Sequence, residues 1–405
     1  MHLLLLTSEQ WPTFRADLAI LFGKYLPSLG VTCDLVTEKS IGFGNEAYQS
    51  WAAGDALLCE APSNRAGQYI VKFLHQFKVL VTTDYRKYQA VQVRDMTIIA
   101  LVAIVMCKLK KKSFYYWLSY PQSEGQIERA KARGPKAGMR FWFPLMQGLI
   151  GKWLLYRVIL PNANHIFVQS QTMLDMIAYK GIASEKITPV PMGVDLEALQ
   201  HTPIPSGNPL LKGKRVLVYL GTLDRVRQIN ILFNMLVIVR EEIPNILLVL
   251  AGDTEDETHR TWLKHEAHRL GVSEQVVWTG WLPMDEAWRY LAVAEIGLSP
   301  FPRGFLLDMA SPTKAVEYMA FGLPVVANNN PDQAKVIQES DAGICVELTP
   351  KSFAKSVIYL LHNKAQCSEM AKKGRAYITK KRGYDSISNA LAQKYQQLLS
   401  ESVSI

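Results

Sequence analysis

The chain has 405 residues, 49% of them hydrophobic and 20% charged, and it carries a formal net charge of +9. These values are typical of a soluble globular protein too long for one ordinary core, so two domains are expected. The five cysteines show no C-x-x-C spacing, which argues against a zinc site or a disulfide scaffold and suits a reducing compartment.

The first element expected along the chain is a strand at residues 2–8. The opening apolar run has only four residues, with no basic segment before it and no small-residue cleavage pattern after it, so it does not resemble a signal peptide. The longest apolar run without a formal charge, 96–107, is too short to span a bilayer, which takes roughly 20 residues. We therefore expect no transmembrane helix.

The N-terminal half continues with alternating strand and helix patterns. Further strands are expected at 31–38, 55–60, 78–84, 90–95, 113–121 and 165–170. Helices are expected at 15–29, 66–76, 96–108, 141–159 and 171–180. The segment 187–195, with two prolines and a glycine, is interpreted as the link between domains.

The C-terminal half shows the same alternation more clearly. Strands are expected at 215–221, 245–253, 275–280, 296–301, 324–329 and 343–348, and helices at 228–241, 256–270, 284–293, 311–321 and 350–363. Continuous apolar strands separated by helices indicate a parallel sheet covered on both faces. The fold class predicted is α/β, with two similar doubly wound sheets facing each other across a cleft, and ligands bind beyond the carboxyl ends of strands in such sheets.

The positive charge is concentrated in one region. Residues 1–200 hold 22 Lys/Arg and 15 Asp/Glu, and residues 101–150 alone hold 9 basic and 2 acidic residues. Segments 108–117 and 131–160 interleave these basic residues with Phe, Trp, Tyr and Leu, a pattern that favours docking on an anionic membrane surface. The alternative is that the aromatic residues belong to the core and the lysines are ordinary solvent-facing charges.

Lys314 is the most informative single residue. Ser311 is expected to be the N-cap, Pro312 the first helical residue and Gly322 the C-terminal cap of one helix. A lysine in the first turn opposes the helix dipole by roughly 0.3–1 kcal/mol, unless an anion binds there. Either Lys314 extends into solvent, or it joins the helix N-terminus in binding phosphate.

Two further features favour a phosphate ligand. Arg225 and Arg227 follow the glycine that ends the first strand of the C-terminal half, and arginine matches phosphate oxygens well. Glu317 lies on the same helix as Lys314, where its carboxylate can accept hydrogen bonds from a ribose diol. Taken alone, each feature also fits a solvated loop or an exposed helix residue.

The residues above carry a resemblance to a known family. The run "SPTKAVEYMAFGLPVV" (311–326), with "GTLDRVR" (221–227), "VVWTGWLP" (276–283) and "ITPVPMGVD" (187–195), resembles the GT-B glycosyltransferases of the GT4 class. The resemblance is specific in the C-terminal half and loose in the first 110 residues. It implies two Rossmann-like domains, a nucleotide-sugar donor on the second of them, and retention of the anomeric configuration.

The resemblance also implies a domain division and residue roles. It gives an acceptor-binding domain at 1–190 with the membrane-docking surface, a nucleotide-sugar domain at 196–384, and a helix at 385–405 that crosses back to the first domain. Arg225, Arg227, Ser311, Thr313 and Lys314 would hold the diphosphate. The nucleoside would contact Gly221, Gly280, Trp281, Leu282 and Glu317.

The chain departs from the family pattern at several positions. The family often has a second glutamate eight positions before the one matched by Glu317, but residue 309 is Met309; Asp308 is the substitute predicted to contact the donor sugar. The usual Lys-Gly pair appears as Arg227-Gln228, and the usual Gly-Gly loop is replaced by "WPTFRAD" at 11–17. The donor can therefore differ from the commonest ones.

The acceptor side is expected at the strand ends of the N-terminal half. Arg15, Arg94, Asp95 and Glu124 are the polar groups there. Asp95 is the best candidate to bind or deprotonate an acceptor hydroxyl. The alternative is a structural role for Asp95, either paired with Arg94 or capping the helix at 96–108.

These observations predict a transferase that moves a sugar from a UDP- or GDP-sugar to a lipid-linked or glycan acceptor in cell-surface polysaccharide or glycolipid synthesis. Asp95, Arg225 and Lys314 are its expected catalytic residues. We expect no metal or other cofactor, no nucleic-acid partner, and a cytoplasmic location on the inner face of the cell membrane. The alternatives are a nucleotide-sugar epimerase or hydrolase on the same fold, and a non-catalytic nucleotide-sugar-binding protein.

Overall fold

A computed structural model describes the chain except for residues 14, 41–50, 61, 63, 200–203 and 404–405, so Phe14 of the 11–17 loop lies outside the described residues. The chain divides into two compact units, each described here by itself. Unit 1 comprises Met1–Met192 with Tyr384–Ile405, and unit 2 comprises Gly193–Gly383.

Unit 1 is built on a seven-stranded sheet in the order β3-β2-β1-β4-β5-β6-β7, and every neighbouring pair is parallel. Its strands are β1 (His2–Thr7), β2 (Thr32–Glu38), β3 (Ala56–Cys59), β4 (Ala90–Arg94), β5 (Ser113–Leu118), β6 (His165–Val168) and β7 (Ile187–Pro189). The chain reverses its direction of travel across the sheet between β1 and β4, so the topological switch point lies there.

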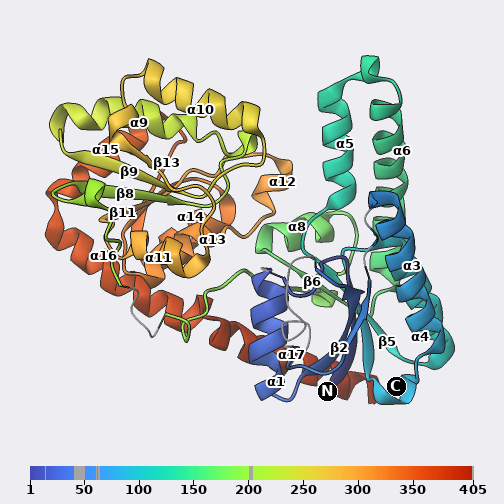
Figure 1. Ribbon diagram of the computed structural model, residues 1–405. Coiled ribbons are helices and arrows are strands. Elements are labelled where there is room, and N and C mark those ends of the chain that lie inside the picture. Colours follow the sequence, from blue (N-terminus) through green and yellow to red (C-terminus); the bar gives the residue numbers. More distant parts are fainter. Residues whose placement is uncertain (14, 41–50, 61, 63, 200–203, 404–405) are drawn as a thin grey trace. The chain divides into compact units, whose positions relative to one another are not determined.

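Helices connect these strands. The described helical elements of unit 1 are η1 (Asp17–Tyr25), α1 (Leu26–Ser28), α3 (Arg65–Thr82), η2 (Tyr85–Lys87), α4 (Thr97–Lys110), α5 (Gln122–Arg133), η3 (Pro135–Ala137), α6 (Met139–Leu154), η4 (Leu155–Ile159), α7 (Leu160–Asn162), α8 (Gln171–Tyr179), η5 (Ser184–Lys186) and α17 (Tyr384–Val403). Figure 1 shows α5 and α6 as an antiparallel pair that extends beyond the sheet of unit 1.

Unit 2 repeats the plan with a six-stranded parallel sheet in the order β10-β9-β8-β11-β12-β13. Its strands are β8 (Arg215–Leu220), β9 (Ile246–Ala251), β10 (Val276–Trp278), β11 (Ile296–Ser299), β12 (Val325–Asn328) and β13 (Gly343–Val346). Its described helical elements are η6 (Pro209–Leu211), η7 (Arg225–Arg227), α9 (Asn230–Glu242), α10 (Glu257–Arg269), η8 (Ser273–Gln275), α11 (Met284–Leu291), α12 (Phe305–Asp308), α13 (Thr313–Ala320), α14 (Pro331–Ser340), α15 (Pro350–His362), α16 (Lys364–Tyr377) and η9 (Ile378–Arg382). The switch point of this sheet lies between β8 and β11.

The two parallel, doubly wound sheets confirm the fold class expected from the alternating apolar runs. Each sheet has apolar side chains on both faces, because helices cover both. In unit 1, one of these cores includes the C-terminal helix α17, whose Tyr384, Leu391 and Tyr395 are buried against strand residues. The Tyr395 hydroxyl donates a hydrogen bond of 2.5 Å to the Gln92 side chain in the middle of β4.

Some expected elements were wrong. The run 78–84 forms the end of α3 and not a strand, because Leu80 is fully buried on a helix that continues from Arg65. β-branched residues favour strands only weakly, so packing along a long helix overrides them. The start of the expected link, Ile187–Pro189, is the edge strand β7, where proline costs no ladder hydrogen bond on the open side.

Among the described residues, no helix combines the length and the hydropathy needed to cross a membrane.

Tyr318 of α13 connects the two strands at the switch point of unit 2. Its hydroxyl accepts a hydrogen bond from the Leu220 N–H (2.8 Å) and donates one to the Leu298 carbonyl (3.1 Å), so it links the ends of β8 and β11. The ring lies against Gly297, where an added Cβ would be 2.3 Å from it. The position of α13 over the sheet therefore depends on the absence of a side chain at Gly297.

We predict that Gly297→Ala lowers the free energy of unfolding by about 1–3 kcal/mol, because the new methyl group overpacks the Tyr318 ring. Gly207→Ala is the matched control, since no atom lies within 4 Å of a Cβ built there. Urea unfolding of both variants measures the difference. Equal stability of the Gly297→Ala variant and the wild type would contradict this packing.

Candidate functional site

The strongest candidate site lies in unit 2, where β8 and β11 end. Ligands of doubly wound sheets bind in the crevice at such a switch point. Three segments meet there: the turn after β8 that contains η7, the loop after β11, and the first turn of α13. Arg227, Lys314 and Glu317, the groups expected to hold a nucleotide, come from two of these segments.

The ends of β8, β9 and β10 approach one another closely because glycines follow them, at positions 221, 252 and 280. A Cβ on Gly252, at the end of β9, would lie 2.2 Å from the Gly221 carbonyl oxygen. Gly280 forms an isolated bridge with Gly252, which brings the loop after β10 beside the same edge. All three glycines have positive φ, at 128°, 141° and 70°, so other residues there would be strained. The result is an exposed backbone edge that a ligand can approach.

Lys314 is buried in the first turn of α13, with only 8% of its surface exposed. Its Nζ lies 5.1 Å from the centre of the Tyr219 ring and 3.0 Å from the position of a Cβ on Gly221. Burial lowers the pKa of Lys314 to about 7; nearby Arg227 also lowers it, while Glu317 and Asp224 oppose the shift. In the part of the chain that the structure describes, no carboxylate forms an ion pair with this ammonium.

Arg227 is the second cation at this edge. Its guanidinium stacks 4.5 Å above the centre of the Phe301 ring, in the loop after β11. The Nε and Nη1 atoms are shielded from solvent and have no hydrogen-bond partner among the described residues. Guanidinium donors left unpaired in this way are costly, so the site is suited to an anion that would accept from them.

Glu317 follows Lys314 by three residues and therefore lies on the same side of α13. Burial raises its pKa, while a hydrogen bond from Thr313 and the charge of Lys314 act in the opposite direction. Its Oε2 is shielded from solvent and has no partner in the described chain. This oxygen can accept a hydrogen bond from a ligand hydroxyl.

Arg225 differs from Arg227 although only one residue separates them. It is exposed, and its Nε donates to the Asp256 carboxylate at 3.2 Å. Exposed pairs of this kind contribute about 0–1 kcal/mol, so a ligand phosphate can compete with Asp256. The turn itself is anchored elsewhere, by the Thr254 hydroxyl donating to Asp224 at 2.9 Å and the Leu223 N–H donating to the Asp253 carbonyl at 2.9 Å.

The expectation that Ser311 caps the helix was wrong. The N-cap is Pro312, without a side-chain cap, and Thr313 is the first helical residue. The Ser311 hydroxyl instead donates to Asp332 at 2.8 Å and accepts from Arg382 at 3.2 Å, within a buried ion pair between those two residues. The Ser311 hydroxyl therefore bonds Asp332 and Arg382 on other elements and does not cap the N–H groups of α13. A role for Ser311 at the diphosphate stays a prediction that its backbone would have to fulfil.

Asp308, the residue predicted to contact the donor sugar, is engaged by its own loop. Its two carboxylate oxygens accept from Arg303 at 2.7 and 2.9 Å, and the Gly304 N–H donates to it at 3.2 Å. Burial alone would raise the pKa of Asp308, but Arg303 and the Gly304 N–H lower it. Met309, where the family pattern has its acid, is buried. The sugar contact therefore remains a prediction.

The loop after β10 presents one apolar side chain to solvent. Trp281 is 56% exposed, while Leu282 packs against the core of unit 2. With Gly280 held beside Gly252, the loop 280–282 lies along the edge described above. An exposed indole there offers a flat surface to a nucleobase.

In unit 1, three of the predicted acceptor-side residues are brought together, but their charges are paired. Arg94 is buried and contacts Asp17 at 2.9 Å, Glu9 at 3.2 Å and Asp95 at 3.4 Å. Asp95 also accepts from the Ser119 N–H at 2.7 Å and from the Ser119 hydroxyl. Arg15 joins the network through Glu9 at 3.2 Å. This geometry favours the structural alternative for Asp95, and its catalytic role stays a prediction.

Glu124 contrasts with Asp95. It lies in the first turn of α5, directly after β5, and is 4% exposed. Both of its carboxylate oxygens are shielded from solvent, and no contact to them within the described chain meets full hydrogen-bond geometry, although burial and then the charge and hydrogen bonding of Glu124 raise the pKa of the neighbouring Tyr156. A buried carboxylate that is not fully hydrogen-bonded is unfavourable in the folded chain alone. Of the four acceptor-side residues, Glu124 is the one with acceptor capacity left for a substrate hydroxyl.

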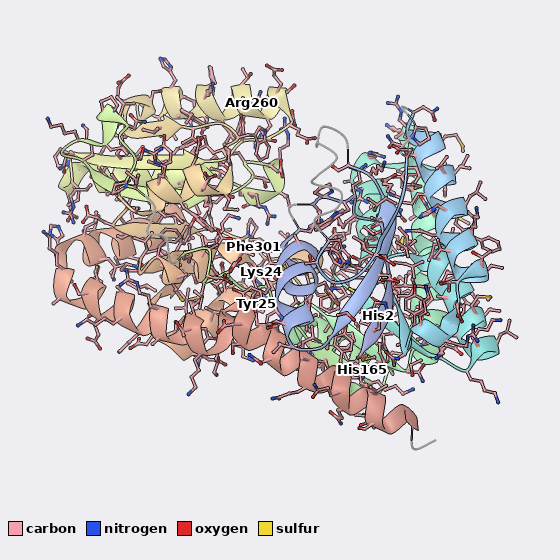
Figure 2. All side chains as sticks on the ribbon, turned by 60° about the horizontal axis from the view of Figure 1, so that its bottom comes forward. His2, Lys24, Tyr25, His165, Arg260 and Phe301 are labelled. Carbon is pink, nitrogen blue, oxygen red and sulfur yellow. The ribbon has the colours of Figure 1, made fainter. Side chains whose placement is uncertain are left out.

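Sequence reasoning missed the groups that support these cations. Tyr219 lies inside β8 and reads only as a core residue, yet its ring contacts Lys314. The ring of Phe301 stacks against Arg227. Arg260 of α10 donates to Asp253, the residue after Gly252, at 2.8 Å. Phe301 and Arg260 are labelled in Figure 2. Of these three residues, only Phe301 could have been predicted to lie at the site, because it stands at the end of an expected strand.

The C-terminal half of the chain is similar in sequence to known proteins. Residues 202–377 match the family described as Glycosyl transferases group 1. The chain is similar to spore coat protein SA of Bacillus subtilis (23% identity, 46% of this chain and 50% of the relative). It is also similar to a GDP-mannose-dependent alpha-(1-6)-phosphatidylinositol monomannoside mannosyltransferase of Mycobacterium tuberculosis (26%, 56% of this chain and 60% of the relative). The matches thus span about half to three fifths of these relatives.

The fold extends over the whole chain in solved structures. Anabaena HepE in complex with UDP superposes with a TM-score of 0.72 at 14% identity, covering 98% of this chain and 100% of that one. This identity level supports the fold and not the activity. The chain has the two-domain α/β fold of the GT-B class.

We predict that Lys314→Met stabilises the ligand-free protein by roughly 1–3 kcal/mol below pH 7, because it removes a buried charge without a partner. Between about 7 and the ordinary lysine value of 10.5, the unfolded chain binds a proton that the folded chain does not, so wild-type stability rises with pH there. The advantage of the variant should therefore shrink across that window. Denaturant unfolding at several pH values measures it, with exposed Lys355→Met as the control. A gap independent of pH would contradict the burial of this charge.

Proposed function

We propose that this protein is a glycosyltransferase that moves a sugar from a nucleoside-diphosphate sugar to a lipid-linked or glycan acceptor, in cell-surface polysaccharide or glycolipid synthesis. The donor binds at the β8–β11 switch point of unit 2. The reaction is of the GT4 class and proceeds with retention of configuration, without a metal ion.

One observation carries the proposal. Lys314 and Arg227 place two shielded cations at the same edge, and no described carboxylate pairs with either. Two like charges in a low-dielectric site repel each other; Glu317 and Asp224 offset this only in part and form no ion pair with either cation in the described chain, so an anion from outside the chain is favoured there. A diphosphate has the charge and the oxygen acceptors to do so, and the UDP complex of HepE has the same fold.

The rest of the donor follows from the surrounding groups. The diphosphate lies against Lys314 and Arg227, where the exposed backbone at Gly221 and the start of α13 add N–H donors. The ribose hydroxyls then donate to the unpaired oxygen of Glu317. The base lies along the loop 280–282.

Sugar transfer from a nucleoside diphosphate depends on fixed positive charge beside the leaving phosphate and does not require a protein nucleophile. As the bond from the sugar to the diphosphate breaks, negative charge grows on the leaving phosphate and positive charge on the sugar ring. Preorganised cations stabilise the leaving group most because they need no reorganisation. The leaving phosphate itself takes the proton of the acceptor hydroxyl, which accounts for retention without a covalent enzyme intermediate.

The acceptor belongs to unit 1. There we assign Glu124 to the acceptor hydroxyl in preference to Asp95, since the hydrogen bonding of Glu124 within the described chain is with the Tyr156 hydroxyl, whereas Asp95 is held by Arg94 and Ser119. The mycobacterial relative named above transfers mannose to a phosphatidylinositol derivative, and a lipid acceptor suits the surface of unit 1 described next.

That surface is built mainly by α6. Seven large apolar side chains recur on one side of it and are 47–74% exposed: Met139, Trp142, Phe143, Met146, Leu149, Ile150 and Trp153. We call this set the α6 stripe. Its opposite side packs on α5, where Gly148 and Gly151 permit close approach to Ser123. An amphipathic helix whose apolar side faces solvent suits docking into a membrane interface, which would place the protein on the inner face of the cell membrane.

To test the donor site, we predict that Lys314→Ala and Arg227→Ala each lower nucleotide-sugar turnover by about 10- to 150-fold, the loss of a charge-assisted contact. Glu317→Ala should weaken donor binding, and exposed Arg225→Ala should have the smallest effect. Steady-state turnover with UDP- and GDP-sugars measures these changes. Arg269→Ala, an exposed arginine of α10, is the control.

Near-wild-type turnover in both the Lys314 and Arg227 variants would remove the donor site. Incubation of the donor without acceptor separates the rival activities. Epimerised sugar or free nucleotide at the full rate under that condition would assign an epimerase or hydrolase in place of a transferase.

To test membrane docking, we predict that Trp142→Ser with Phe143→Ser lowers affinity for anionic vesicles at least about tenfold, because each aromatic ring buries apolar area in the interface. Leu210→Ser with Tyr359→Ser, two exposed apolar positions of unit 2, is the control. Vesicle sedimentation measures the affinity. Equal losses in the two double variants would contradict docking through the α6 stripe.

A further inference from the structure

A second basic site lies in unit 1, apart from the strand-end residues discussed above. It is an open pocket of about 550 Å³ between the end of α6, the π-helical turn η4 and the end of α8. Three cations line it, Lys152, Arg157 and Lys180, together with the aromatic residues Trp153, Tyr156 and Tyr179. We call it the α6–α8 pocket.

The cations of this pocket are available to a ligand. Neither the Lys152 ammonium nor the Arg157 guanidinium forms an ion pair or a side-chain hydrogen bond with any described residue. Lys180 is held by a cation–π contact, with its Nζ 4.5 Å from the centre of the Tyr156 ring. That contact orients the ammonium without neutralising it.

No acidic side chain of the described chain lines the pocket. Glu124 interacts with the Tyr156 hydroxyl by charge and hydrogen bonding, but it is buried in α5 and is not part of the lining. Three cations around one cavity without an anion repel one another, so the cavity is complementary to an anion. Phosphate fits best, since the arginine fork and the lysine ammonium groups match its oxygens.

The pocket is continuous with the α6 stripe. Trp153 and Leu149 belong to both, and both residues are about half exposed. Where that stripe enters a membrane interface, the pocket lies at the level of the lipid headgroups, since cations on interfacial helices lie beside the apolar side chains that insert. Tyr179, which is 93% exposed, adds a second aromatic group of the kind enriched at membrane surfaces.

We propose that the α6–α8 pocket binds the phosphate of an anionic membrane phospholipid. This inference rests on the proposed membrane docking and deepens it, because it replaces diffuse attraction by one headgroup site. It is independent of the donor site in unit 2. Arg157 and Lys152 bind the phosphate oxygens, Lys180 adds the third charge, and the aromatic rings border the glycerol region.

The test compares two double variants with the same change in charge. Lys152→Gln with Arg157→Gln removes two of the three pocket cations, and Lys131→Gln with Lys136→Gln removes two exposed lysines, one in the last turn of α5 and one in η3. Binding of the full chain is measured to phosphatidylcholine vesicles with and without phosphatidic acid. The pocket variant should lose at least about tenfold more affinity for the phosphatidic acid vesicles than the other, because surface charges act diffusely and the pocket acts by contact.

Three results would overturn the proposal. Equal losses in the two variants would show that only diffuse charge matters. A wild-type protein that binds both vesicle types equally would show that no anionic headgroup is recognised. Inorganic phosphate that competes as well as a soluble short-chain phosphatidic acid would make the pocket a free-anion site and not a lipid site.

The donor site is monitored in the same samples. Thermal stabilisation by UDP or GDP should be unchanged in the pocket variant, which shows that it is folded. Loss of vesicle binding with intact nucleotide binding supports the pocket. Pocket-dependent vesicle binding in a protein without transferase activity would refute the proposed function while leaving the lipid site in place.

Discussion

The burial of the Lys314 ammonium at the end of β8 is the constraint on which the rest of unit 2 depends. A lysine in a first helical turn already opposes the helix dipole, and burial beside Arg227 adds a larger penalty. Such an arrangement persists only where the surrounding structure holds it. Tyr318 does so by bonding β8 and β11, and Gly221 leaves the space that Lys314 occupies. The folded chain therefore carries an electrostatic cost at this edge, which the proposed binding of an anion would lower.

The two units show how one topology can carry opposite electrostatics. At the β1–β4 switch point of unit 1, Arg94 is surrounded by the carboxylates of Asp17, Glu9 and Asp95, so the charge is balanced within the protein. At the β8–β11 switch point of unit 2, Lys314 has an aromatic ring beneath it and no described acid paired with it. Fold alone therefore does not decide whether such an edge suits an anion; what differs is whether a carboxylate of the described chain pairs with the cation.

Much of the architecture was predictable, because each parallel strand is buried on both faces and reads as a continuous apolar run. Lys314 could also be singled out, since its charge is wrong for its place in a helix. What could not be predicted is pairing across elements. Nothing near Ser311 indicates that Asp332 and Arg382 take its hydroxyl, and nothing near Asp308 distinguishes Arg303 from a sugar as its partner. A sequence pattern shows only which neighbours along the chain a polar side chain can bond. Partners that are distant in the sequence determine whether that side chain is still able to bind a ligand.

Unit 1 has two basic regions that differ in their geometry: the exposed lysines near the end of α5 and the cations of the α6–α8 pocket. The exposed Lys131 and Lys136, at the end of α5 and in η3, raise the potential of the surface but do not line the α6–α8 pocket. Lys152, Arg157 and Lys180 converge on one cavity that shares its wall with the α6 stripe. Exposing that stripe to water costs hydrophobic free energy, and α3 and α4 of the same unit expose further large apolar side chains. The proposed lipid surface would cover the apolar side chains of the α6 stripe and would also bring phosphate groups to the cations of the pocket. One proposal thus accounts for both features.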